Sequence, residues 1–377
     1  MATPILALIP SGYKSEKVYS VLPSNGDGDF TFTREGASGQ PNSTRVNKDG
    51  LIEEVNSNVP RLDYSDGSCP SLLLEPSSTN LITYSEDFSQ WESSNVSVLD
   101  NFTVSPSGTQ NASKFTFNGT TNGRVEKNIS VVNGTQYTFS VWLKNDDLAD
   151  PTQVWIGLST SNQGEYVTVT NEWKRFTTTQ VSNGTTEYPR IQTSEVGSIF
   201  AWGAQLENQS YSTSYIATQG SVATRVAETC TDAGNADTFN STEGVLYAEV
   251  SYLDTNDAGY IQISDGTSNN RIIIWNLTST SLRGLVVVGG VAQAQINGGV
   301  ISNNTTFKVA LKYKVNDFAL WVNGVEIGTD VLGLTFGSNV LNKINLSVNS
   351  VEFKGKIKDV RVYDTALTDA ELEALTS

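Results

Sequence analysis

The sequence contains no histidine among its 377 residues, only two cysteines and a single methionine. Histidine is the usual general base near neutral pH and the commonest protein ligand of zinc and copper. Its absence excludes Ser-His-Asp and Cys-His nucleophilic systems, and two cysteines are too few for a metal cluster. A carboxylate pair is the remaining arrangement for hydrolysis, and no predicted strand carries a convincing one. We therefore expect a protein that is not an enzyme.

Basic clusters and long apolar runs are also missing. Lys and Arg number 24 against 40 Asp and Glu, which gives a net charge of −16, and the cations are scattered singly. A phosphate-binding surface needs clustered cations, so this distribution argues against nucleic acid as a partner. No stretch reaches the length of a membrane span, and the opening MATPILALIPSGYK lacks the basic region of a signal peptide. We expect no membrane insertion.

What the sequence has in abundance is Thr, Ser, Asn, Gly and Val in short alternating stretches. In residues 137–144 one set of side chains, Tyr137, Phe139, Val141 and Leu143, alternates with a second set, Thr138, Ser140, Trp142 and Lys144. This alternation predicts a strand with one buried face. The Asn323-Gly324 pair predicts a two-residue hairpin turn, and Thr368 with Glu371 predicts the start of a short helix. Together these patterns predict an all-β protein that ends in a helix.

The spacing of strands and turn residues predicts three parts and a linker. Residues 1–79 hold only short apolar stretches, and we expect an extended arm that lies against a neighbouring subunit or against its own chain. Residues 80–228 contain roughly eight strands, typical of a jelly-roll sandwich. Residues 229–239 have the composition of a linker, and residues 240–377 predict a second β-sandwich.

The C-terminal segments FALWVNGVEIG and FKGKIKDVRVYDTALTDAELEAL resemble the laminin-G-like and pentraxin-like concanavalin A sandwiches. In the middle part, LLLEPSSTNLITYSEDFSQW and AWGAQLENQSYSTSYIATQGSVATR are similar to jelly-roll carbohydrate-binding modules of phage tail and virion proteins. The stretch TRVNKDGLIEEVNSNVPRLDYSDGSCPSLLLEP resembles N-terminal regions of phage structural proteins. These resemblances imply a structural protein at the virion surface, namely a tail fibre, a baseplate-associated protein, or a capsid decoration or head fibre protein.

Such a protein would mediate attachment or particle decoration, with the N-terminal arm anchored to other virion proteins. Because viral appendages are usually symmetric, a homotrimer is the expected assembly. The alternative is a glycan-binding adhesin whose main role is to recognise host-surface carbohydrate.

Two groups of residues are candidate ligand sites. Trp142 and Trp155 both lie opposite the aliphatic face of their strands, where aromatic side chains can stack against sugar rings. The same alternation fits a face that is covered by protein. Asp254, Asp257 and Asp265 occupy loops rich in Gly and Asn, and laminin-G-like domains often hold calcium through such carboxylates. Turn formation is the alternative role for these aspartates, and no cofactor other than calcium is expected.

The two cysteines, Cys69 and Cys230, bracket the predicted middle domain. If the ends of that domain lie close together, a disulfide between them could clasp it. The alternative is that both remain thiols.

Overall fold

The computed structural model describes residues 2–35, 43–119, 123–146, 152–158, 163–256, 259–348 and 351–377. Within these ranges nearly all regular structure is β-strand, which confirms the predicted fold class. The chain forms two compact units, and both are discontinuous in sequence. Unit 1 comprises Met1–Ser38, Ser57–Pro76 and Ala227–Ser377, and unit 2 comprises Gly39–Asn56 and Ser77–Val226. In the part of the chain that is described, no helix has the length and apolarity needed to cross a membrane.

Unit 2 is a sandwich of two five-stranded antiparallel sheets. The first sheet has the order β10 (Glu92–Ser94), β13 (Gly123–Glu126), β20 (Pro189–Thr193), β16 (Gln153–Leu158) and β17 (Gln163–Thr168). The second has the order β11 (Val96–Val104), β12 (Gln110–Asn118), β21 (Val196–Glu207), β15 (Gln136–Asn145) and β18 (Lys174–Val181). Apolar side chains of both sheets, among them Phe139 and Ile156, form one core, as expected when alternating strands pack face to face.

Short elements complete unit 2. They are the strand pairs β5 (Thr44–Val46) with β6 (Ile52–Glu54), β9 (Ser78–Asn80) with β22 (Ala223–Arg225), and β14 (Ile129–Ser130) with β19 (Thr186–Glu187), and the 3-10 helix η1 (Phe88–Gln90).

Unit 1 is also a sandwich. Its larger sheet has the order β31 (Val325–Asp330), β30 (Phe318–Val322), β29 (Phe307–Lys314), β24 (Glu243–Tyr252), β35 (Gly355–Tyr363), β8 (Ser71–Leu74) and β7 (Arg61–Asp63), and β1 (Leu6–Leu8) also pairs with β35. Its five-stranded sheet has the order β28 (Val291–Val300), β27 (Ser281–Val288), β26 (Arg271–Thr278), β25 (Tyr260–Ser264) and β32 (Lys343–Asn345). Side chains from both sheets, such as Leu311 and Ile272, share one buried core.

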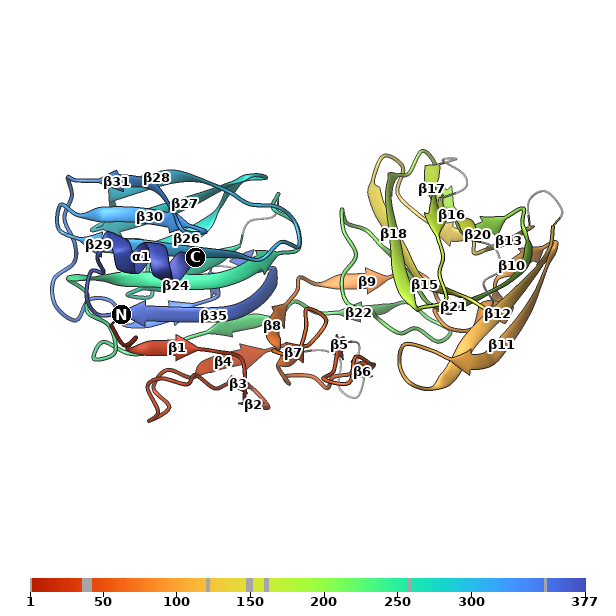
Figure 1. Cartoon of the computed structure of the whole chain (residues 1–377), viewed down its shortest axis with the longest axis horizontal. Coiled ribbons are helices and arrows are strands. Elements are labelled where there is room, and N and C mark those ends of the chain that lie inside the picture. The colour runs from red at the N-terminus through yellow and green to blue at the C-terminus, as the bar shows by residue number, and fades with distance from the viewer. Residues whose placement is uncertain are drawn as a thin grey trace. The chain divides into compact units, whose positions relative to one another are not determined.

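Smaller elements of unit 1 are a sheet of β2 (Tyr13–Lys14), β3 (Lys17–Val18), β4 (Phe30–Thr33) and β23 (Thr229–Thr231), and the pair β33 (Ser347–Val348) with β34 (Val351–Glu352). The helix α1 (Asp369–Thr376) lies in front of β29 and β24 in Figure 1. The predicted capping box of Thr368 and Glu371 is present, and Leu372 and Leu375 pack on the outer side of the larger sheet. The C-terminal helix is therefore confirmed.

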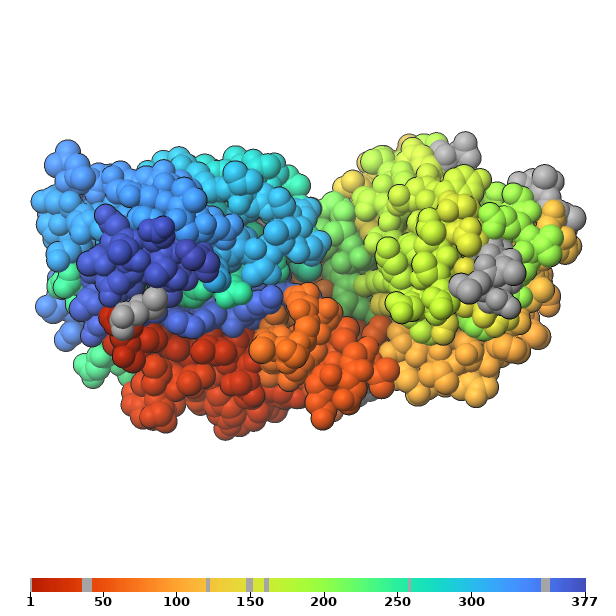
Figure 2. Space-filling view, viewed as in Figure 1, coloured from red at the N-terminus to blue at the C-terminus, as the bar shows by residue number. Residues whose placement is uncertain are grey.

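The N-terminal segment packs on its own chain, which was one of the two alternatives for the predicted arm. Leu6 lies opposite Val362, and the side chains of Leu6, Phe30 and Phe32 are fully buried in the core of unit 1. Figure 2 shows this segment in red against the blue C-terminal strands of the same unit. An apolar segment without a core of its own is stabilised in this way by completing another one.

The predicted linker, residues 229–239, is instead part of unit 1. Thr229–Thr231 forms β23, which pairs with β4, and Cys230 and Phe239 are buried in the core. The linker prediction was therefore wrong, because a composition rich in turn residues does not reveal a short strand that pairs with residues 196 positions away. Residues 39–56 depart from the predicted arm as well, since they belong to unit 2.

Candidate functional site

Trp155 lies on the outer face of the first sheet of unit 2. In β16 the side chains of Val154, Ile156 and Leu158 are fully buried in the core. Alternation along the strand therefore directs Trp155 and Gly157 to the other side of the sheet. This outward direction agrees with the prediction from the sequence.

Two glycines lie beneath the indole of Trp155. A Cβ atom built on Gly164 would lie 2.3 Å from Cζ2 of Trp155, and one on Gly157 would lie 2.7 Å from its Cη2. Gly157 and Gly164 face each other across the pair β16 and β17. No side chain fits at either position without moving the indole, so the six-membered ring of Trp155 covers the bare backbone of both strands.

Trp155 belongs to a row of side chains that crosses the sheet. Its direct neighbours are Tyr166 on β17, which is 66% exposed, and Gln192 on β20. Gln192 in turn lies opposite Arg124 on β13. Residues directly opposite each other on antiparallel strands point to the same face, so an aromatic pair continues into polar groups on one surface.

A second row supplies charged groups that pair with each other. Glu126 accepts from Nε of Arg190 at 2.6 Å and from Nε of Arg124 at 3.0 Å. Arg190 also donates to Oε1 of Gln192 at 3.3 Å. These contacts hold the guanidinium groups in fixed positions beside the aromatic pair.

We refer to Arg124, Glu126, Trp155, Tyr166, Arg190 and Gln192 together as the Trp155 face. Its aromatic part offers an apolar surface for the C–H side of a sugar ring, and its polar part offers donors and acceptors for hydroxyl groups. Two carboxylates in one groove would be needed for glycoside hydrolysis, and Glu126 is already engaged by two arginines.

Trp142 is packed rather than open. It lies on β15, where its ring centroid is 5.2 Å from that of Trp202 and 5.7 Å from that of Tyr215. The guanidinium carbon of Arg175 lies 4.4 Å from the indole centroid. Gly203 has a φ of +65°, and a Cβ there would come within 2.9 Å of Cε3 of Trp142. Protein groups thus pack against the indole, which is half-buried, and this matches the alternative of a covered face.

The two tryptophans do not form one platform. Trp142 lies in the sheet that contains β15, and Trp155 lies in the sheet that contains β16. Both point away from the shared core, so they occupy opposite outer faces of the sandwich. Alternation gave the outward direction of each side chain correctly, but it could not assign the two strands to one sheet.

The structure does not bring Asp254 and Asp265 together. Asp254 lies in the loop before β25 and Asp265 in the loop after it, so the two residues are at opposite ends of that strand. Each carboxylate caps its own loop, since Asp254 accepts from the backbone of Asn256 at 2.9 Å and Asp265 from that of Thr267 at 2.8 Å. Asp257 lies outside the described residues. Within those residues no group of three His, Cys, Asp or Glu is placed to hold a metal.

The predicted disulfide is not formed. Cys69 is exposed in the loop between β7 and β8, whereas Cys230 is fully buried in the core of unit 1. Burial raises the pKa of the Cys230 thiol well above its ordinary value, and the charge of Glu228 acts in the same direction. The clasp hypothesis was wrong because the chain near Cys230 is β23, a strand of unit 1, and not the end of the middle domain.

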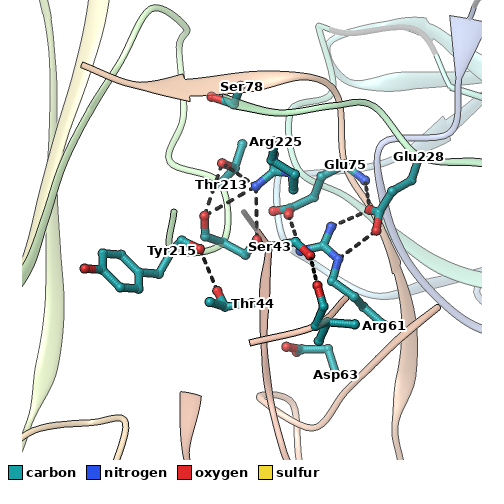
Figure 3. Close-up of polar contacts among 12 residues, drawn as sticks. Ser43, Thr44, Arg61, Asp63, Glu75, Ser78, Thr213, Tyr215, Arg225 and Glu228 are labelled. Carbon is teal, nitrogen blue, oxygen red and sulfur yellow. Dashed lines mark hydrogen bonds and ion pairs between the residues drawn. The ribbon is translucent and has the colours of Figure 1, made fainter. Parts of the chain in front are cut away.

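Carboxylates also meet in the interior of unit 1. Figure 3 shows Arg61 between Glu75 and Glu228. Nη1 of Arg61 lies 2.8 Å from Glu75, and its Nε donates to Glu228 at 2.7 Å. Arg34 donates to the same carboxylate of Glu228 at 2.6 Å. All four side chains are at most 4% exposed, so this cluster is a structural ion network and offers no acid or base to a substrate.

Sequence reasoning missed most of the Trp155 face. The signal was present as two short patterns, Trp155-Ile156-Gly157 and Gly164-Glu165-Tyr166, in which an aromatic residue and a glycine are two positions apart. Such residues share a face of one strand. The pairing of the two strands then places each glycine beside the other.

The C-terminal part of the chain is similar to a known family. Residues 233–373 match the model of the Concanavalin A-like lectin/glucanases superfamily, in agreement with the resemblance seen in the sequence of that part. A comparison with curated proteins finds no match.

Three solved structures are similar to parts of this chain. The CBM40 domain of the Ruminococcus gnavus IT-sialidase, bound to α2,3-sialyllactose, has 19% identity over 36% of this chain and 83% of that chain, with a TM-score of 0.32. Domain 4 of an extracellular arabinanase from Geobacillus stearothermophilus, in complex with arabinotriose, has 16% identity over 45% and 84%, with a TM-score of 0.32. A heptameric SAP-like pentraxin from Limulus polyphemus has 16% identity over 36% and 70%, with a TM-score of 0.29.

Proposed function

We propose that this protein is a non-catalytic carbohydrate-binding protein that holds a sugar ring on the Trp155 face. The observation that carries the proposal is the indole of Trp155 lying over Gly157 and Gly164 beside the exposed ring of Tyr166. An aromatic surface of this kind stacks against the C–H groups of a pyranose. The match of residues 233–373 to a superfamily of lectins and glucanases supports a carbohydrate function for the chain.

The charged groups of the Trp155 face are held in place by pairing with one another. Glu126 is paired with both Arg124 and Arg190, so the face presents oriented hydrogen-bonding groups with one positive charge in excess. Gln192 adds an amide that can donate to or accept from a hydroxyl group. Specificity would then come from hydrogen bonds. A sugar that leaves a polar group of the face or one of its own hydroxyl groups without a partner loses binding free energy.

The test measures binding of the full chain to immobilised neutral polysaccharides of several linkage types, before and after Trp155→Ala. We expect the variant to bind at least tenfold more weakly, equivalent to about 1.4 kcal/mol. Tyr166→Ala should weaken binding in the same assay by a smaller factor. The melting temperature should change little, because these side chains extend outward from the core.

Phe102→Ala is a matched control. Phe102 is an exposed aromatic residue of unit 2 on the other sheet, so its removal should leave binding unchanged. Equal binding by the wild-type chain and Trp155→Ala would overturn the proposal, and so would the absence of binding to every polysaccharide in the panel.

The role in a phage particle, with a virion-surface location, virion partners and a trimeric assembly, stays a prediction from the sequence resemblance. A glycan-binding surface protein is compatible with that setting, since attachment to a host surface requires recognition of its carbohydrates.

A further inference from the structure

The five-stranded sheet of unit 1 has an outer face of unusual charge. Its strands β25, β26, β27, β28 and β32 contain no Asp or Glu, although the whole chain has 40. Ile272 and Ile274 point into the core, so alternation directs Arg271 and Trp275 outward. The register then places Tyr260 and Arg283 beside Trp275 on this same face.

Two arginines give the face a positive charge that the described residues do not neutralise. Nε of Arg283 donates to the side-chain oxygen of Asn297 at 2.7 Å, and its guanidinium carbon lies 5.2 Å from the ring centroid of Trp275. Nε of Arg271 is buried and has no hydrogen-bond partner. Among the residues that the structure describes, neither arginine forms an ion pair. In a chain of net charge −16, this is a site for an anion.

A buried acceptor lies on the same face. Gln262 is only 3% exposed, and its Oε1 has no hydrogen-bond partner among the described residues. Ile261 and Ile263 on either side point into the core, so Gln262 points outward, next to Ile273 on β26. A buried carbonyl oxygen without a donor is costly. Oε1 of Gln262 therefore lacks a hydrogen-bond donor, and an N–H or O–H group of a ligand could supply one.

The aromatic side chains complete the site. Tyr260 and Trp275 meet edge to face, with ring centroids 5.9 Å apart. Both are half-buried and lie two residue pairs along the sheet from Gln262, on the same face. A ligand that meets these groups carries an acidic group for Arg271, a hydroxyl for Gln262 and an apolar ring face for the aromatic pair.

We propose that this face of unit 1 binds a carboxylate-bearing saccharide. The carboxylate lies against Arg271, a ring hydroxyl donates to Oε1 of Gln262, and the C–H side of the ring lies against Trp275 and Tyr260, where Arg283 stacks on the indole. The site is separate from the Trp155 face, which is in unit 2 and whose two arginines are both paired with Glu126, and it does not depend on that proposal.

Calorimetric titration of the full chain tests this site with two matched pairs of probes. One pair is a galacturonate trisaccharide and its carboxyl-reduced neutral counterpart, and the other is sialyllactose and lactose. We expect at least one acidic probe to bind, and its neutral partner to bind at least tenfold more weakly. Arg271→Gln should weaken binding of the acidic probe at least tenfold.

Gln262→Leu separates a ligand role from a structural one. If Oε1 of Gln262 accepts a hydrogen bond from a ligand hydroxyl, this variant should weaken binding. It should also raise the melting temperature, because an unsatisfied buried acceptor is removed. Trp155→Ala serves as the control and should leave binding of the acidic probe unchanged, which distinguishes failure of this site from failure of the Trp155 face.

Three outcomes would overturn the inference. The first is no binding of either acidic probe, and the second is equal binding by the wild-type chain and Arg271→Gln. The third is complete competition by inorganic sulfate at the concentration of the saccharide, which would show a site for simple anions alone.

Discussion

Glu228→Gln should strongly destabilise unit 1. Oε1 of Glu228 accepts from Arg34 at 2.6 Å and from Arg61 at 2.7 Å, and Oε2 accepts from Arg61 and from the backbone N–H of Glu75 at 3.0 Å. The side chains of Arg34, Arg61, Glu75 and Glu228 contain two positive and two negative charges away from water. The substitution removes one negative charge and leaves two buried guanidinium groups to share Glu75.

Loss of a proton from Arg61 cannot relieve this imbalance. In the wild type the charges of Glu228 and Glu75 raise the pKa of Arg61 above its ordinary value, although burial acts in the opposite direction. Even without Glu228 a guanidinium group keeps its proton, because its ordinary pKa is already far above neutral. An amide in place of the carboxylate also directs an NH2 group toward groups that only donate. Breaking a buried ion pair by removing one partner costs about 3–5 kcal/mol.

For a unit of this size, such a loss lowers the melting temperature by about 6–20 °C. Differential scanning calorimetry of the full chain measures it. Glu243→Gln is the control, because Glu243 pairs with Lys314 at 2.9 Å at the surface, where ion pairs contribute at most about 1 kcal/mol. If Glu228→Gln melts no lower than Glu243→Gln, the network does not stabilise the fold and the reasoning fails.

Three further predictions follow from the packing. Deletion of residues 2–35 should unfold unit 1, as circular dichroism of the truncated chain would show, and a native melt after the deletion would contradict the assignment of these residues to its core. Trp142→Ala should cost about 3–5 kcal/mol through the cavity it leaves, whereas Trp155→Ala should shift the melt far less, and equal shifts in thermal unfolding would contradict this contrast. Burial raises the pKa of Glu86, an effect that outweighs hydrogen bonds from Tyr215 and Asn111, so stability falls as pH rises through that pKa. Glu86→Gln should thus be more stable than the wild type at neutral pH and lose this advantage toward pH 4, and a less stable variant in urea melts at pH 7 would refute the sign.

The sequence alone was sufficient for features that depend on neighbouring residues. Alternation directed Trp142 and Trp155 away from the core, because successive side chains of a strand point to opposite faces. Asn323 and Gly324 have φ angles of 49° and 77°, as their pairing in a two-residue turn requires. The capping box of α1 forms within four consecutive residues. In each case the energetic preference is local, and so it can be read from a short stretch of sequence.

Only the tertiary structure decided which strands lie side by side. Leu6 pairs with Val362, which brings the first and last parts of the chain into one sheet. The same kind of distant pairing puts β15 and β16 in different sheets and sets Gly164 beside Gly157 under the indole of Trp155. A strand's alternation is satisfied equally well beside many partners, and the choice among them depends on how whole sheets fill a shared core. The candidate sites depend on that choice. The sequence could therefore predict single residues, whereas the structure shows which residues of neighbouring strands share one face of a sheet.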